Sequence, residues 1–168
     1  MERKLNISSK AVGILILFLL VIISVCSKIN YSGVQTDGSA ITIYDDGTEA
    51  ASYSLVDLRQ MVPVSEELHI ESTGGEDEDG VFTGVMLEQL LKKAGIESCK
   101  TIIFTAGDGY SVAIKADEMD KVLVVYEKNG AALEPFSEGG AGPFRIAVIG
   151  DPYGNRSLKC LAEIRCKP

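Results

Sequence analysis

Histidine is nearly absent from this chain of 168 residues, which contains only His69. A nucleophilic Ser-His-Asp site would have to use that one side chain. Without a second histidine as partner, we expect His69 to be a structural or surface residue rather than a metal ligand or a base. The sequence also lacks a Gly-rich phosphate-binding loop and any internal repeat.

Cysteine is scarce as well, and outside the amino-terminal segment the cysteines are Cys99, Cys160 and Cys166. No spacing among them matches a zinc ribbon or a redox Cys-x-x-Cys pair. We place Cys160 and Cys166 in one strand, about 20 Å apart at ~3.3 Å per residue, which is too far for them to bond to each other. In an oxidising compartment Cys99 could pair with either of them, and the odd thiol would be buried.

Positive charge is limited, with 16 Lys and Arg against 24 Asp and Glu and a net charge of −8. The stretch through Cys26 has three basic residues and one acidic residue, so the rest of the chain carries −10. Such a domain repels nucleic acid and anionic lipid headgroups. A phosphate-bearing cofactor would therefore need local cations, and most of the carboxylates are expected to serve solubility.

The longest apolar stretch, Ala11 to Val25, follows the basic residues Arg3, Lys4 and Lys10. A membrane-spanning helix needs ~20 apolar residues, so this length is typical of a signal peptide or a short anchor. Because cationic residues stay inside, we expect the remaining chain to lie at the extracytoplasmic face of the cell membrane.

Three outcomes are open for this segment: an uncleaved anchor, cleavage after Ser27, or cleavage before Cys26 with lipid modification of that cysteine. The stretch Ile23 to Cys26 resembles a bacterial lipoprotein box, and we favour an anchor or a lipoprotein over full release. The predicted organisation is a signal, anchor or lipoprotein segment at 1–26, a polar linker at 27–39 and a folded domain at 40–168.

Alternating and helical patterns predict the elements of that domain. Ser54 and Asp57 are placed to cap a short helix, and Gly95 to end a second helix over Met86 to Ala94. Strands outnumber helices and do not alternate regularly with them, which favours an α+β fold of β-rich mixed sheets with a few short helices. Strands are predicted at 40–44, 67–72, 101–106, 110–114, 121–127, 144–149 and 158–166, with turns at 45–47 and 129–130.

Four motifs follow one another at distinctive intervals. They are Thr83-Gly84-Val85 before a Leu-Leu helix, Asp108-Gly109-Tyr110-Ser111, the Asn129-Gly130 turn after a Tyr126-bearing strand, and Gly142-Pro143-Phe144-Arg145. In this order they resemble the molybdopterin-binding domain of the sulfite oxidase family, over about Leu55 to Cys166. The resemblance implies a β-rich fold around a pyranopterin, whose terminal phosphate is held by backbone amides and basic side chains.

By position, the resemblance assigns cofactor-binding roles to Ser72, Asp108, Tyr110, Arg145 and Lys159. Arg145 and Lys159 match basic residues near the cofactor, although Arg145 could equally be a surface ion-pair partner. Asp108 could be an acid or base, but its Gly neighbours favour a turn residue. Tyr110 and Tyr126 would point into a family-type pocket, or each could be a core aromatic residue.

Two departures from the family bear on chemistry. Ser72 stands where the family carries the cysteine whose thiolate ligates molybdenum, and a serine oxygen is a harder, poorer ligand for this purpose. The following stretch, Glu76 to Asp79, is acidic where family members tend to be basic, which would weaken phosphate binding. This stretch lacks the spaced pattern of a calcium loop, so we expect a solvated loop there.

We therefore expect a membrane-tethered binding or partner module without molybdenum catalysis, which recognises a small anionic ligand or a membrane protein. No cofactor is expected, although molybdopterin is possible by resemblance. The alternative is an active molybdopterin-dependent oxidoreductase with an unusual ligand set and a membrane electron-transfer partner. A third possibility is a scaffold for protein contacts at the cell surface.

Overall fold

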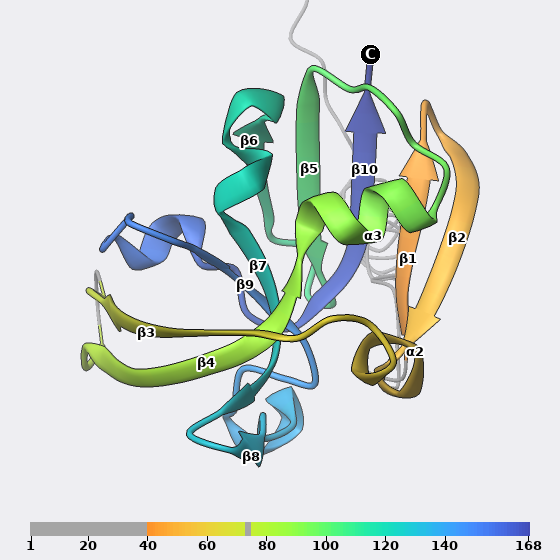
Figure 1. The fold of residues 1–168 in the computed structure, drawn as a ribbon. Coiled ribbons are helices and arrows are strands. Elements are labelled where there is room, and N and C mark those ends of the chain that lie inside the picture. The colour runs from red at the N-terminus through yellow and green to blue at the C-terminus, as the bar shows by residue number, and fades with distance from the viewer. Residues whose placement is uncertain (1–39, 73–74) are drawn as a thin grey trace, which may run out of the picture. The chain divides into compact units, whose positions relative to one another are not determined.

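The computed structural model describes residues 40–72 and 75–168, which form two five-stranded sheets (Figure 1). The first sheet has the order β2-β1-β10-β5-β6, and the second has the order β3-β4-β7-β8 with β9 also paired to β7. The strands are β1 (Ala40–Asp45), β2 (Thr48–Ser54), β3 (Val64–Ile70), β4 (Glu78–Met86), β5 (Thr101–Ala106), β6 (Ser111–Lys115), β7 (Val122–Lys128), β8 (Ala131–Ala132), β9 (Arg145–Val148) and β10 (Leu161–Lys167).

The helices are few and short: α2 (Leu55–Arg59), α3 (Leu87–Lys93) and the 3-10 turns η1 (Ala116–Lys121), η2 (Phe136–Glu138) and η3 (Gly154–Arg156). Helix α2 begins as predicted, because the Ser54 side chain accepts from the Asp57 backbone while the Asp57 carboxylate accepts from Ser54. Helix α3 ends before Gly95, which has a φ of 79°.

The first sheet is mixed, because β1 and β10 pair in parallel while the other strand pairs of this sheet are antiparallel. Strands β1 and β2 form a hairpin around Asp46 and Gly47, whose φ angles of 44° and 83° match the predicted turn. The prediction of a β-rich α+β fold is confirmed by these two sheets and the few short helices.

Two hydrophobic clusters fill the described domain. The larger joins the inward side chains of β1, β5 and β10 to the apolar face of α3, including Leu87, Leu90 and Leu91. Figure 1 shows α3 crossing in front of strands β5, β10 and β1. The smaller cluster consists of buried residues from β3, β4, β7 and β9, namely Ile70, Phe82, Leu123, Val125 and Ala147.

Strand β4 approaches β7 closely at Gly84, where the pairing also shifts register. A Cβ atom at Gly84 would lie 2.1 Å from the carbonyl oxygen of Val124. Only glycine fits this contact, which explains the glycine in the Thr83-Gly84-Val85 motif.

Three element predictions need correction. The last strand begins at Leu161 rather than Leu158, because Cys160 has a φ of 52° and donates its N–H to the carbonyl of Ala141. Cys160 and Cys166 therefore do not share one strand. Strand β3 begins at Val64, earlier than predicted. The acidic run at 76–79 is not wholly a solvated loop, because β4 begins at Glu78 and the Glu78 side chain is half-buried there.

The predicted membrane segment and linker, residues 1–39, lie outside the described residues, and the domain boundary at 39/40 stays a prediction. Among the residues that the structure describes, no helix has the length and apolar character needed to span a membrane.

Candidate functional site

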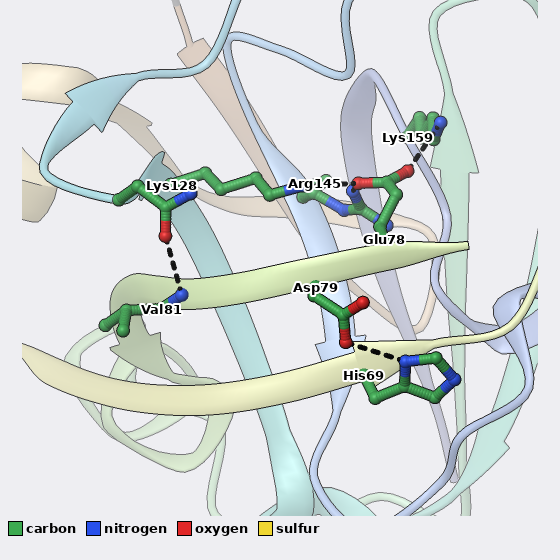
Figure 2. A network of polar contacts seen from close by, with 8 residues as sticks. His69, Glu78, Asp79, Val81, Lys128, Arg145 and Lys159 are labelled. Atoms are coloured by element: carbon green, nitrogen blue, oxygen red, sulfur yellow. Dashed lines mark hydrogen bonds and ion pairs between the residues drawn. The ribbon is translucent and has the colours of Figure 1, made fainter. Parts of the chain in front are cut away.

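Three cationic side chains converge on one carboxylate at the start of β4 (Figure 2). Arg145 donates from Nη1 to Oε2 of Glu78 over 2.7 Å, and Nζ of Lys159 lies 2.8 Å from Oε1. Lys128 places its Nζ 3.5 Å from Oε2. We call these four residues the Glu78 cluster; they come from β4, β7, β9 and the connection before β10.

The strand period of two determines which acidic residue joins this cluster. Glu78 and Phe82 are four residues apart on β4 and share a face, while Asp79 and Val81 point to the other face and are exposed. Gly80 lies between Glu78 and Phe82, and a Cβ there would be 3.0 Å from Cε of Lys128. The missing side chain at Gly80 thus leaves room for Lys128 to reach across β4 toward Glu78.

Arg145 is the most buried charged residue of the described chain, with 1% of its surface exposed. It begins β9 opposite Val125 of β7, and its guanidinium lies 5.4 Å from the centre of the Phe82 ring. Lys128 approaches the same ring at 5.3 Å. The expectation of a surface ion-pair partner is thus wrong in one respect: Arg145 is paired, but its own side chain is buried, while its partner Glu78 is partly exposed.

The Arg145 guanidinium is only partly satisfied. Its Nε is buried and has no hydrogen-bond partner among the described residues. A guanidinium carries five N–H donors, and burial of an unpaired donor is unfavourable. The cluster therefore offers more hydrogen-bond donors than the Glu78 carboxylate accepts.

The charges determine the protonation of Glu78. Burial alone raises the pKa of this carboxyl, but the hydrogen bond from Lys159 and the charges of Arg145 and Lys159 outweigh burial and lower the pKa from 4.5 to about 2. Glu78 is consequently ionised at every pH at which the protein would normally work.

A pocket of about 360 Å³ adjoins the cluster. One wall is the loop from β8 to β9, which approaches itself so closely that a Cβ at Gly140 would lie 2.2 Å from the carbonyl oxygen of Glu134. The lining combines the four cluster residues with Asn129, Ala131, Ala132, Leu133, Glu134, Gly139, Gly140 and Ala141.

The structure brings together two of the five residues that resemblance assigned to a cofactor. Arg145 and Lys159 line this pocket, whereas Ser72, Asp108 and Tyr110 are not part of its lining. Ser72 is exposed after the end of β3, and its backbone N–H donates to Asp77 over 2.9 Å.

Asp108 and Tyr110 lie in the turn between β5 and β6. The Asp108 carboxylate accepts from the backbone N–H of Tyr110, as a turn-forming aspartate does, and the Tyr110 side chain is exposed. Tyr126, by contrast, is buried in the larger cluster beneath the Arg59 guanidinium. The assignment of all five residues to a cofactor stays a prediction.

His69 is exposed on β3 and faces Asp79 across the β3-β4 pair, with 2.7 Å between Nδ1 and the carboxylate. The hydrogen bond and charge of Asp79 raise the pKa of His69. In the described ranges, no group of three or more His, Cys, Asp or Glu side chains is arranged to hold a metal ion.

The thiols of Cys99, Cys160 and Cys166 are free. Cys166 is buried in the larger cluster and Cys99 packs against that cluster. Burial and the neighbouring Cys99 raise the pKa of the Cys166 thiol to about 12.

Sequence reasoning missed two members of the Glu78 cluster. The spacing of Glu78, Gly80 and Phe82 could have indicated that Glu78 shares the buried face of a strand, had residues 78–86 been recognised as one strand. Lys128 carries no comparable signal, because its role depends on the pairing of β7 with β4.

The two sheets form a known type of β-rich fold. The chain is similar to the crystal structure of the sulfane dehydrogenase SoxCD from Paracoccus pantotrophus, with a TM-score of 0.66 and 20% sequence identity. The match covers 77% of this chain and 38% of that chain, so this protein spans well under half of its structural neighbour.

The family is established by sequence. Residues 33–168 match the family described as "Oxidoreductase molybdopterin binding domain", and the chain belongs to that family. This confirms the resemblance drawn from the four motifs and the type of fold it implied. No curated protein matches the chain.

Proposed function

We propose that this protein is a membrane-tethered, extracytoplasmic member of its family that has lost molybdenum chemistry and acts as a binding or partner module. The observation that carries the proposal is Ser72 at the position where the resemblance puts the molybdenum-ligating cysteine. A hydroxyl does not supply the soft thiolate that tunes the metal.

The cations of the pocket support the same proposal. In a cofactor-binding member, basic residues at the positions of Arg145 and Lys159 would meet the terminal phosphate of the pterin. Here both side chains already pair with Glu78, at 2.7 and 2.8 Å. The residues present therefore do not fit the group that the family name implies, and we derive no reaction through it.

The tether is proposed from the sequence. The basic residues before Ala11 keep the amino terminus inside, and the apolar stretch to Val25 is long enough to engage the membrane. The polar residues 27–39 then give the domain reach from the membrane surface.

Molybdenum and pterin analysis of the protein purified from its native host tests the loss of cofactor. We expect no stoichiometric metal and no pterin, and one molybdenum per chain would establish the oxidoreductase alternative instead. Native expression is essential, because another host can fail to load the cofactor.

Protease treatment of intact cells, followed by membrane fractionation, tests the location. We expect the domain to be degraded from outside and the untreated protein to sediment with membranes. Full-length protein in the soluble medium, or protection from the protease, would contradict the tether.

A further inference from the structure

We propose that Cys99 and Cys166 form a disulfide in the functioning protein, which ties the end of β10 to the connection between α3 and β5. Cys160 is then the cysteine of the described domain that stays a thiol. The inference rests on the extracytoplasmic location given under the proposed function, because such a compartment supplies the oxidant.

The two thiols are neighbours in the folded chain. Cys166 is buried in the larger hydrophobic cluster, and Cys99 packs against the same cluster. Burial raises the pKa of the Cys166 thiol, and the charge and hydrogen bond of the Cys99 thiol raise it further. A hydrogen bond between two thiols places their sulfur atoms in contact, and rotation of the two side chains from there can close an S–S bond.

The backbone holds both cysteines in place. Cys166 lies near the end of β10, where it pairs with Asp45 of β1 on one side and with Ile102 of β5 on the other. The residues that follow the two cysteines are also joined, because the N–H of Lys100 donates to the carbonyl of Lys167 over 2.7 Å. Figure 1 shows the connection from α3 reaching the end of β10 before it enters β5. The disulfide would therefore join segments that the fold already brings together.

Cys160 lies at the wrong end of the sheet to compete for Cys99. It precedes β10, and its carbonyl accepts from the N–H of Gly107, which follows the last residue of β5. Cys99 lies before the first residue of β5, and the six residues of that strand span about 20 Å. This separation exceeds the reach of a disulfide. The odd thiol, which we expected to be buried, is therefore the half-buried one.

Formation of this bond is a two-electron oxidation, and the oxidant is the disulfide of an exported dithiol-disulfide exchange protein. The Cys99 thiolate, which is the less buried of the two, attacks one sulfur of that disulfide and releases the other as a thiolate. The Cys166 sulfur then displaces the oxidant from Cys99 as the S–S bond of the protein forms. The two protons lost by the cysteines end on the two sulfurs of the oxidant, which leaves as a dithiol.

Peptide mass spectrometry of the protein from its native host tests the pairing. The cells are quenched in acid, the free thiols are alkylated in denaturant, and the peptides are separated without reduction. We expect a linked pair of peptides that contain Cys99 and Cys166, together with an alkylated Cys160. Alkylation of both Cys99 and Cys166, or a link from Cys160 to either of them, would overturn the proposal.

A second experiment supplies the oxidant, so its result does not depend on where the protein lies. Purified full-length protein in non-ionic detergent is equilibrated with glutathione at an oxidising poise, and its thermal midpoint is compared with that of the reduced protein. A link between positions 99 and 166 closes a loop of about 70 residues, for which we expect the midpoint to rise by roughly 10 °C. Cys99→Ser should abolish this rise, and the matched control Cys160→Ser should retain it.

Cys99 is the residue to replace, because Cys166 is buried in the core and its substitution would disturb folding. No rise in the unmodified protein, or a rise that survives Cys99→Ser, would overturn the disulfide. The two proposals fail separately. A domain that the protease degrades from outside but whose Cys99 and Cys166 are both alkylated would keep its location and lose the disulfide, whereas a linked pair in a protected domain would count against the location alone.

Discussion

Removing the negative charge of Glu78 should reduce stability in a way that depends on pH. The folded protein lowers the pKa of this carboxyl from 4.5 to about 2, so folding favours its ionised form. Because the pKa is depressed in the folded state, the stabilisation is complete above the ordinary pKa and is lost as the pH falls toward 2. Glu78→Gln lacks this contribution at every pH.

The magnitude follows from the same shift. A depression from 4.5 to about 2 corresponds to about 3 kcal/mol of free energy of unfolding, at roughly 1.4 kcal/mol per pKa unit. The Glu78 side chain is 22% exposed, so solvent screening of the pair is modest. Linkage then leaves about 40% of the difference in free energy of unfolding between the two proteins at pH 3 and about a tenth at pH 2.

Urea unfolding of both proteins at pH 7, 5 and 3, at constant ionic strength, measures this difference. Far-ultraviolet circular dichroism is a suitable probe, because the chain has no tryptophan. Glu134→Gln is the control, since Glu134 lines the pocket but pairs with no cation among the described residues. A constant difference between the unmodified protein and Glu78→Gln from pH 7 to pH 3 would refute the ion pairing.

Three further predictions concern the fold. Gly84→Ala should lower the free energy of unfolding by about 3 kcal/mol or more, because its Cβ would lie 2.1 Å from the carbonyl oxygen of Val124. Chemical denaturation measures this loss, and a loss below ~1 kcal/mol would contradict the close approach of the two strands. In reduced native protein at pH 8, an alkylating reagent should modify Cys160 before Cys166, because burial raises the pKa of the Cys166 thiol to about 12. Mass spectrometry of peptides measures the order of modification, and equal rates at the two thiols would disprove the prediction. A fragment of residues 40–168 should be soluble and unfold cooperatively, as differential scanning calorimetry would show, whereas an aggregated or molten fragment would move the domain boundary.

Sequence patterns predicted the caps and turns that depend on residues close together in the chain. The Ser54-Asp57 capping box, the Asp46-Gly47 hairpin and the glycine after α3 each depend on residues within a few positions of one another. The end of β10 was also predicted, but its start was not. Cys160 adopts a positive φ while its N–H bonds to Ala141, and a contact between distant segments of this kind leaves no trace in the strand pattern.

The candidate site was predicted only in part. By position, the resemblance to the family pointed to Arg145 and Lys159, and the structure places both beside one pocket. Glu78 precedes Arg145 by 67 residues in the chain. The pairing of β4 with β7 and of β7 with β9 brings the two side chains together. No periodic pattern encodes such a register, so the partner of the two cations could not be named from sequence.

The acidic run shows how one strand can divide residues of the same charge between two roles. Treated as a loop, Glu76 to Asp79 would simply repel any anion that approached the pocket. Since β4 begins at Glu78, the alternation of the strand turns Glu78 toward Arg145 and turns Asp79 toward His69 on the opposite face. Glu78 then neutralises part of a cationic site, while Asp79 stays exposed and holds an imidazole. The part of the acidic run that lines the pocket is therefore the paired carboxylate of Glu78, and Asp79 on the opposite face does not contribute to the pocket.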